Sequence, residues 1–183
     1  WGTGARRVGR SGNISDGAKD VGLDREWCYD CTITGNTTKN CWNAGIALFL
    51  SCQNITISGN SLFIDDGQEG RRDGIWLTGV NRGLYRKDFG HRQVSITGNT
   101  VRAEGKTRHG ISIGSGYDIV CAANTMSNAD VLDQTGRAQL IGRHGPQQPS
   151  ESLAGAIVKP LGPQWRFAIA PPDERHPQRR LCP

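Results

Sequence analysis

Short segments of alternating apolar and polar residues recur along the first two-thirds of the chain. Each segment ends at an Asn that follows Gly, or Ala in the last copy, and successive copies of this Asn lie 23, 24, 39 and 25 positions apart. The copies are Asn13, Asn36, Asn60, Asn99 and Asn124. The positions three and five residues before each Asn are mostly apolar, as Ile57 and Ile55 are before Asn60. This two-residue period predicts a β-strand with one buried face in every copy.

A second marker, Gly followed by an aliphatic residue, stands between successive copies of the Asn. It occurs at Gly22-Leu23, Gly45-Ile46, Gly74-Ile75 and Gly110-Ile111. It opens a second alternating segment whose inward positions are aliphatic except for Arg25, near the N-terminal end, where we expect an incomplete rung. Each unit therefore contains at least two short strands separated by turns. We expect the Asn to sit in a turn, where its side chain bonds local backbone and tolerates a left-handed conformation.

The length of the unit narrows the architecture. A unit of about 24 residues is too short for a four-stranded propeller blade, and the spacing of leucines typical of leucine-rich repeats is missing. Stacked coils, each adding one strand to each of several parallel sheets, fit the pattern best. We therefore expect an all-β solenoid in which the alternating apolar rows face a common core.

Four segments carry a resemblance to a known superfamily. They read Thr-Ile-Thr-Gly-Asn at 32–36, Ile-Thr-Ile-Ser-Gly-Asn at 55–60, Gly-Ile-Ala-Leu at 45–48 and Gly-Ile-Trp-Leu at 74–77. They resemble rungs of the pectate-lyase-like, right-handed parallel β-helix proteins, and the resemblance implies about four to five such rungs. That superfamily includes polysaccharide lyases, mannuronan epimerases, polygalacturonases and phage tailspike depolymerases. The resemblance thus implies a polysaccharide partner, but no motif here singles out one member's catalytic residues.

The repeat also sets the expected domain organisation. The β-helix domain is expected to span 1–126, and the 39-residue unit requires inserted loops at 62–73 and 79–92, the second of which should reach over the face that bears Trp76. All eight prolines fall between 146 and 183. We therefore expect an irregular tail over 127–183. Its apolar segments, 154–158 and 165–170, would be the parts that dock on the open end as a partial cap.

Charge and hydropathy restrict the partners. The net charge is +5 with a pI of about 9.1, and residues 70–92 contain six Lys or Arg against two Asp. A mildly basic protein attracts anionic partners, such as nucleic acid or an acidic polysaccharide, and this small excess of charge does not decide between them. Nucleic-acid binding lacks a basic-aromatic motif, and it is the resemblance that implies the polysaccharide. No segment approaches the roughly 18 apolar residues of a membrane span. The sequence leaves localisation open; the resemblance is compatible with an extracellular or virion-associated protein.

The six cysteines do not predict a metal site. Cys28 and Cys31 form a C-x-x-C half-site, but no second half completes it, so neither a metal nor another cofactor is expected. Cys28 and Cys52 both lie eight residues before their Asn, which places them on adjacent rungs. Two readings remain open, stacked core thiols and a disulfide, because the distance between rungs permits a bridge.

The alignment of units brings candidate catalytic residues together. Asp73 and His109 each stand just before the Gly marker of successive units, and Arg72 and Arg108 each precede them by one position. A His held by a carboxylate is suited to act as a general base. The neighbouring arginines would neutralise a uronate carboxylate and ease removal of its α-proton. A structural ion pair at a turn is the alternative.

Five further residues are candidates for binding substrate. Trp76 lies on the outward row and is suited to stack on a sugar ring, unless it packs beneath the inserted loop. Asp24 and Glu26 point the same way two residues apart, a carboxylate pair that would suit hydrolysis if suitably spaced. Lys87 and His91 lie in the longer insertion, where the alternative is a solvated basic loop.

Two functions from different classes follow. The first is an enzyme that acts on an acidic polysaccharide by lyase, epimerase or hydrolase chemistry. The second is a non-catalytic carbohydrate-binding or structural segment of a larger protein such as a phage tailspike, either within a longer chain or as a homotrimer.

Overall fold

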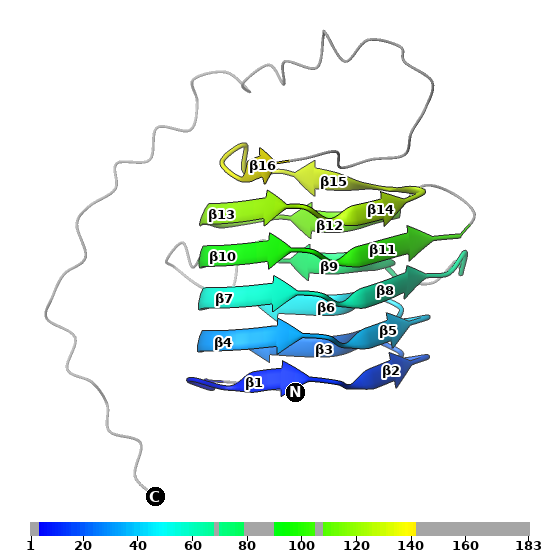
Figure 1. Cartoon of the computed structure of the whole chain (residues 1–183), viewed down its shortest axis with the longest axis horizontal. Helices are drawn as coiled ribbons and strands as arrows, with labels where there is room; N and C mark the ends of the chain where they lie inside the picture. The colour runs from blue at the N-terminus through cyan, green and yellow to red at the C-terminus, as the bar shows by residue number, and fades with distance from the viewer. Residues whose placement is uncertain (1–3, 68–69, 79–89, 105–107, 142–183) are drawn as a thin grey trace, which may run out of the picture. The chain divides into compact units, whose positions relative to one another are not determined.

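The chain winds into a coil of β-strands. The computed structural model describes residues 4–67, 70–78, 90–104 and 108–141, all of which fall within one compact unit, Trp1–Gln147. These residues form sixteen strands, and three consecutive strands make one turn of the coil (Figure 1). Five complete rungs result, and a single strand begins a sixth. The expected number of rungs is therefore confirmed.

Each strand pairs in parallel with its counterparts on neighbouring rungs, which generates three sheets. Sheet 1 contains β1 (Gly9–Ser11), β4 (Tyr29–Thr34), β7 (Gln53–Ser58), β10 (Arg92–Thr97), β13 (Tyr117–Ala122) and β16 (Gln139–Ile141). Sheet 2 contains β2 (Ile14–Asp16), β5 (Thr37–Lys39), β8 (Ser61–Ile64), β11 (Thr100–Ala103) and β14 (Thr125–Ser127). Sheet 3 contains β3 (Val21–Glu26), β6 (Ala44–Phe49), β9 (Asp73–Leu77), β12 (Arg108–Ile113) and β15 (Ala129–Asp133).

The coil is right-handed, as expected. In Figure 1 the strands of sheets 1 and 2 cross the front of the coil in one direction, and those of sheet 3 return behind them. The chain climbs by one strand per turn from β1 to β16, and this combination of rotation and rise is right-handed. Right-twisted strands favour this hand for crossovers between parallel strands.

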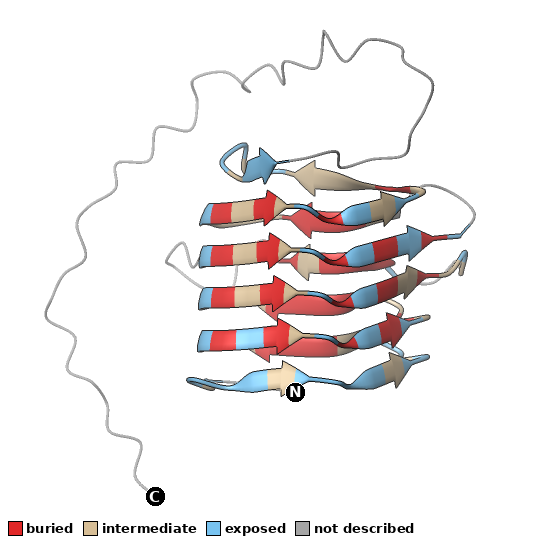
Figure 2. Cartoon of the chain, viewed as in Figure 1, coloured by how far each residue is buried: buried red, intermediate tan, exposed pale blue. Residues whose placement is uncertain are grey.

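Alternation along the strands produces the core. The inward residues of the central rungs are buried and aliphatic, and they appear as red bands in Figure 2. Ile57 and Ile96, both expected to be buried, have no exposed surface. The expectation of an incomplete rung at Arg25 is wrong, because β1 to β3 form a complete first rung. The side chain of Arg25 is buried there, opposite Leu48 on the next strand. Cys28 and Cys52 are buried in the core and form no disulfide with each other, which agrees with the alternative of core thiols.

The Gly-Asn markers form the corner between sheets 1 and 2. The backbone N–H and side-chain amide of Asn36 both donate to Oδ1 of Asn60 at 2.9 Å, and Asn60 repeats this pattern with Asn99 at 3.1 and 2.9 Å. The side-chain amide of Asn60 also donates to the carbonyl of Ile33 on the preceding rung. The Gly, not the Asn, takes the left-handed conformation, with φ of 61° at Gly59. The expected left-handed Asn is therefore wrong, whereas the expected bond to local backbone is present, as the side-chain amide of Asn36 donates to the carbonyl of Thr34 at 3.1 Å. The Asn side chains also form a ladder along the coil.

Several expected boundaries need correction. Residues 62–64 belong to β8 and Asp73 to β9, so the first insertion spans 65–72. The second insertion ends before Arg92, which begins β10, and its residues 79–89 lie outside the described residues. The coil continues beyond residue 126 through β15 and β16 to Ile141. The expected cap segments, 154–158 and 165–170, also lie outside the described residues.

Candidate functional site on the outer face of sheet 3

The two insertions flank a single strand, β9. Residues 65–72 precede it and residues 78–91 follow it, whereas four residues make the corresponding first connection on the rungs below and above. Asp73 begins β9 and Trp76 lies on its outer side, opposite Ala47 on one neighbouring strand and Ser112 on the other. On the outer face of sheet 3, the residues around β9 therefore depart from the repeat, and this is where we look for a functional site.

Arg71 links three of these side chains. Its Nε forms an ion pair with the carboxylate of Asp73, and its Nη2 donates to Oγ of Ser112 at 2.7 Å. Its guanidinium also lies 4.6 Å from the centre of the Trp76 ring. Phe49 contacts the same indole edge-on, with ring centres 5.6 Å apart. Trp76 is thus held between an aromatic neighbour and a cation, which fixes its orientation on the sheet.

His109 forms the second part of the cluster. Its Nδ1 lies 2.8 Å from Oδ1 of Asp130, and the two side chains are 41% and 42% exposed. An irregularity in the pairing of β12 with β15 places Asp130 directly opposite His109. The imidazole is therefore both oriented by a carboxylate and accessible to solvent, which are the two conditions for proton exchange with a substrate.

Asp73 connects the two parts electrostatically. Burial raises the pKa of its carboxyl, which is only 2% exposed, while the hydrogen bond and charge of Arg71 and the charge of His109 act in the opposite direction. The nearby carboxylate of Asp130 adds to the upward shift of the Asp73 pKa. Asp73, Arg71, His109 and Asp130 are thus close enough to influence one another, and they form one site, the sheet 3 cluster, together with Trp76 and Ser112.

The structure separates the expected catalytic residues. Asp73 and His109 belong to the same cluster, but the carboxylate that holds His109 is Asp130, whereas Asp73 forms its ion pair with Arg71. The buried side chain of Arg72 instead forms an ion pair with the half-buried Asp65. The backbone of Arg108 lies in β12, and its side chain is outside the described residues.

Of the expected binding residues that the structure describes, only Trp76 lies in the sheet 3 cluster. Trp76 is half-buried in the cluster, as its outward position predicted. Asp24 lies on the outer row of β3 but is only 8% exposed, whereas Glu26 is half-buried. Lys87 is outside the described residues. His91 is corrected to a core residue: it is fully buried, and its Nδ1 accepts the backbone N–H of Cys52 at 3.3 Å.

Three members of the cluster, Arg71, Ser112 and Asp130, were not among the candidates from the sequence. Arg71 lies in an insertion, where no repeat fixes the direction of a side chain. Asp130 lies in the last complete rung, which lacks the Gly marker and has only one residue between β14 and β15, so the spacing of the other rungs does not locate it. The run of charged residues at 71–73 was the available signal for Arg71.

The described part of the chain was examined for metal-binding clusters and for membrane-spanning helices. No group of three or more His, Cys, Asp or Glu side chains there is arranged to hold a metal ion. No helix within the same ranges has the length and apolar character that crossing a bilayer requires.

Comparison of the chain with protein-family models, with curated proteins and with solved structures gave no match. The functional argument therefore depends on the geometry of the sheet 3 cluster and on the parallel coil that presents it.

Proposed function

We propose that the sheet 3 cluster binds an acidic polysaccharide and removes a proton from a uronate residue, with His109 as the general base. The observation that carries the proposal is the contact between Nδ1 of His109 and Asp130, in a pair that remains accessible to solvent. The parallel coil and its repeat support kinship with the pectate-lyase-like superfamily, whose members act on such polymers. The carboxylate of the uronate and the basic region around the insertions provide the electrostatic attraction.

The protonation of the imidazole follows from its partner. When Nδ1 of His109 carries the proton and donates it to Asp130, Nε2 presents a lone pair that can accept a proton from substrate. Asp130 also stabilises the imidazolium that forms. This assigns Asp130 as the positioning residue and His109 as the group that contacts the reacting carbon.

The reaction that fits this arrangement is elimination. His109 takes the proton from the carbon next to the uronate carboxylate. The electron pair of the broken carbon–hydrogen bond then forms a carbon–carbon double bond. The bond from the β-carbon to the glycosidic oxygen breaks, and the departing oxygen takes up a proton from the imidazolium. Arg71 would stabilise the charge that develops on the carboxylate, and Trp76 offers an apolar surface for a sugar ring. Hydrolysis is less well supported, because Asp24 of the expected carboxylate pair is largely buried.

The test uses the purified chain with polygalacturonate, alginate and hyaluronate, and it follows new reducing ends together with the absorbance of unsaturated uronates. The chain should generate both signals on at least one polymer. His109→Gln should lower the rate by about 10² to 10⁴. Asp130→Asn should lower kcat and shift the pH profile. Asp118→Asn, a matched loss of charge on β13, should retain full activity. Full activity in His109→Gln would remove it as the base.

Binding without turnover is the second candidate function, and one observation favours it. Arg71 already satisfies Asp73 and Ser112, so the cluster is stable without a substrate. A chain that binds the polymers, but produces neither reducing ends nor unsaturated sugars, would replace the enzymatic proposal with this one.

A further inference from the structure

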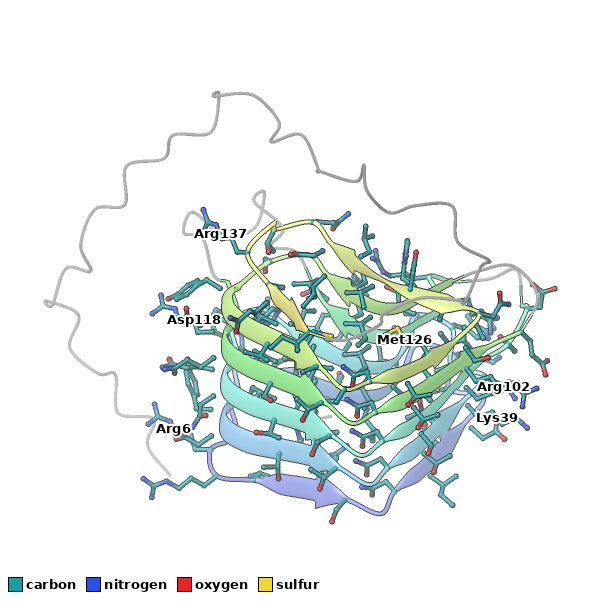
Figure 3. All side chains as sticks on the ribbon, turned by 45° about the horizontal axis from the view of Figure 1, so that its top comes forward. Arg6, Lys39, Arg102, Asp118, Met126 and Arg137 are labelled. Atoms are coloured by element: carbon teal, nitrogen blue, oxygen red, sulfur yellow. The ribbon has the colours of Figure 1, made fainter. Side chains whose placement is uncertain are left out.

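The outer face of sheet 2 carries a row in which a phenyl ring lies between two cations. Lys39 on β5, Phe63 on β8 and Arg102 on β11 occupy successive positions in register. Nζ of Lys39 lies 5.8 Å from the centre of the Phe63 ring, and Cζ of Arg102 lies 6.0 Å from it. Figure 3 shows Lys39 and Arg102 on the same side of the coil, projecting outward. Cation–π attraction thus holds both charges beside one ring.

A row of hydroxyl groups lies beside this cationic row. Thr37, Ser61 and Thr100 lie two residues before Lys39, Phe63 and Arg102 on the same three strands, and Thr125 continues the hydroxyl row on β14. All four are exposed. Residues two apart on a strand point to the same side of the sheet. Together the two rows form one surface, the sheet 2 strip, which offers cations, an aromatic ring and hydroxyl groups along the coil axis.

The spacing of the strip matches a sugar polymer. Adjacent rungs are about 4.8 Å apart, so Lys39 and Arg102, two rungs apart, are separated by about 10 Å along the axis. A pyranose unit with its linking oxygen is about as long as one rung is high. A chain lying along the coil would therefore place one sugar beside Phe63 and the carboxylates of the sugars on either side near Lys39 and Arg102.

The charge of the strip distinguishes a glycan from a nucleic acid. The row contains two cations, and it begins with Asp16, which accepts a hydrogen bond from Asn40 at 3.0 Å. Duplex DNA carries one charge per about 1.7 Å of its axis, far denser than these two cations could neutralise. One carboxylate on each sugar or on alternate sugars is a closer match, and the hydroxyl row suits the sugar hydroxyls.

We propose that the sheet 2 strip is a second binding surface for an acidic polysaccharide, which lies there along the coil axis. The strip would bind the same class of ligand as the sheet 3 cluster, and to that extent it rests on the proposed function. It lies on a different sheet from His109, however, and binding there requires no turnover. It would hold the polymer on the protein while the sheet 3 cluster acts on another part of the same chain, or it would act alone if the protein only binds.

The experiment measures the binding of polygalacturonate by affinity electrophoresis, and it locates the binding of a short oligogalacturonate from amide chemical shifts. The double variant Lys39→Gln/Arg102→Gln should bind about tenfold more weakly. The control Arg6→Gln/Arg137→Gln removes the same charge elsewhere on the coil and should change binding less than about threefold. Phe63→Leu keeps an apolar side chain, so it separates loss of the ring from loss of folding. Shift changes should include Thr37, Ser61 and Thr100.

The outcomes separate this proposal from the proposed function. His109→Gln should leave binding at the strip unchanged, and loss of turnover in that variant says nothing against the strip. Equal weakening in the two double variants would show attraction by net charge alone and overturn the strip. Tighter binding of a single-stranded oligonucleotide at the same residues would assign the strip to nucleic acid instead. Shift changes confined to sheet 3 would also overturn it.

Discussion

The corner between sheets 1 and 2 and the corner between sheets 2 and 3 are built on opposite principles. The first consists of the same two residues on each of the five rungs, Gly-Asn or once Ala-Asn, and its Asn side chains bond to one another along the coil. The second ranges from one residue between β14 and β15 to eight residues between β8 and β9. The second contributes Arg71, whose side chain bonds Ser112 in sheet 3 on the next rung.

The difference shows how a solenoid separates stability from function. Each buried Asn satisfies polar groups on the rungs below and above it, so a change at one position would leave several donors and acceptors unpaired. In the variable corner, side-chain bonds between rungs such as that from Asn43 to Asp20 lie at exposed sites. The length of the connection differs from rung to rung. The sheet 3 cluster lies beside the variable corner, where side chains are free to specialise.

The largest expected effect is on the ladder. Asn60→Ala should lower the free energy of unfolding by about 3 to 5 kcal/mol, because it removes the acceptor of the Asn36 backbone N–H, the side-chain donor to the carbonyl of Ile33 and one of the two donors to Oδ1 of Asn99. Urea denaturation followed by circular dichroism measures this. Asn13→Ala, at the exposed end of the ladder, should cost about 1 kcal/mol or less. Similar losses in the two variants would show that the ladder does not carry the stability ascribed to it.

The next effect concerns His91, which burial holds neutral. Burial lowers the pKa of the His91 imidazole from 6.5 to about 4. The unfolded chain therefore binds a proton between these two values that the folded chain does not, and stability falls as the pH drops from 6.5 to 4. The loss should be about 3 kcal/mol, and His91→Gln should abolish that part of the dependence. Parallel curves of unfolding free energy against pH for the two proteins would contradict this assignment.

The smallest effect is expected within the sheet 3 cluster. Asp73→Asn removes a buried charge whose desolvation opposes its ion pair with Arg71, and Arg71 is one-third exposed, so water can replace the partner. The free energy of unfolding should change by about 1 kcal/mol or less. Turnover of the polysaccharide should fall, because Arg71 loses the contact that orients it. A loss of more than about 3 kcal/mol would assign the cluster to the scaffold instead.

Much of the fold follows from the sequence because a coil repeats its own geometry. Ile57 and Ile96 occupy the same position relative to their Asn and are buried together, as the alignment predicted. The strands of sheet 2 were less apparent, since they are short and their inward row includes polar residues such as Thr38. The partner of His109 was not predictable, because a local irregularity at Gly110 changes which residue lies opposite.

Native-state hydrogen exchange resolved by residue tests the contrast between the two corners most directly. The amide of Asn60, which donates to Asn99 within the ladder, should exchange only through global unfolding. The amide of Arg71, which donates to the side chain of Asn43 at an exposed site, should exchange through local opening at a far lower free energy. The account predicts a clear gap between these two amides. Equal protection of both would contradict the claim that the Asn corner holds the coil together while the variable corner is free to carry the site.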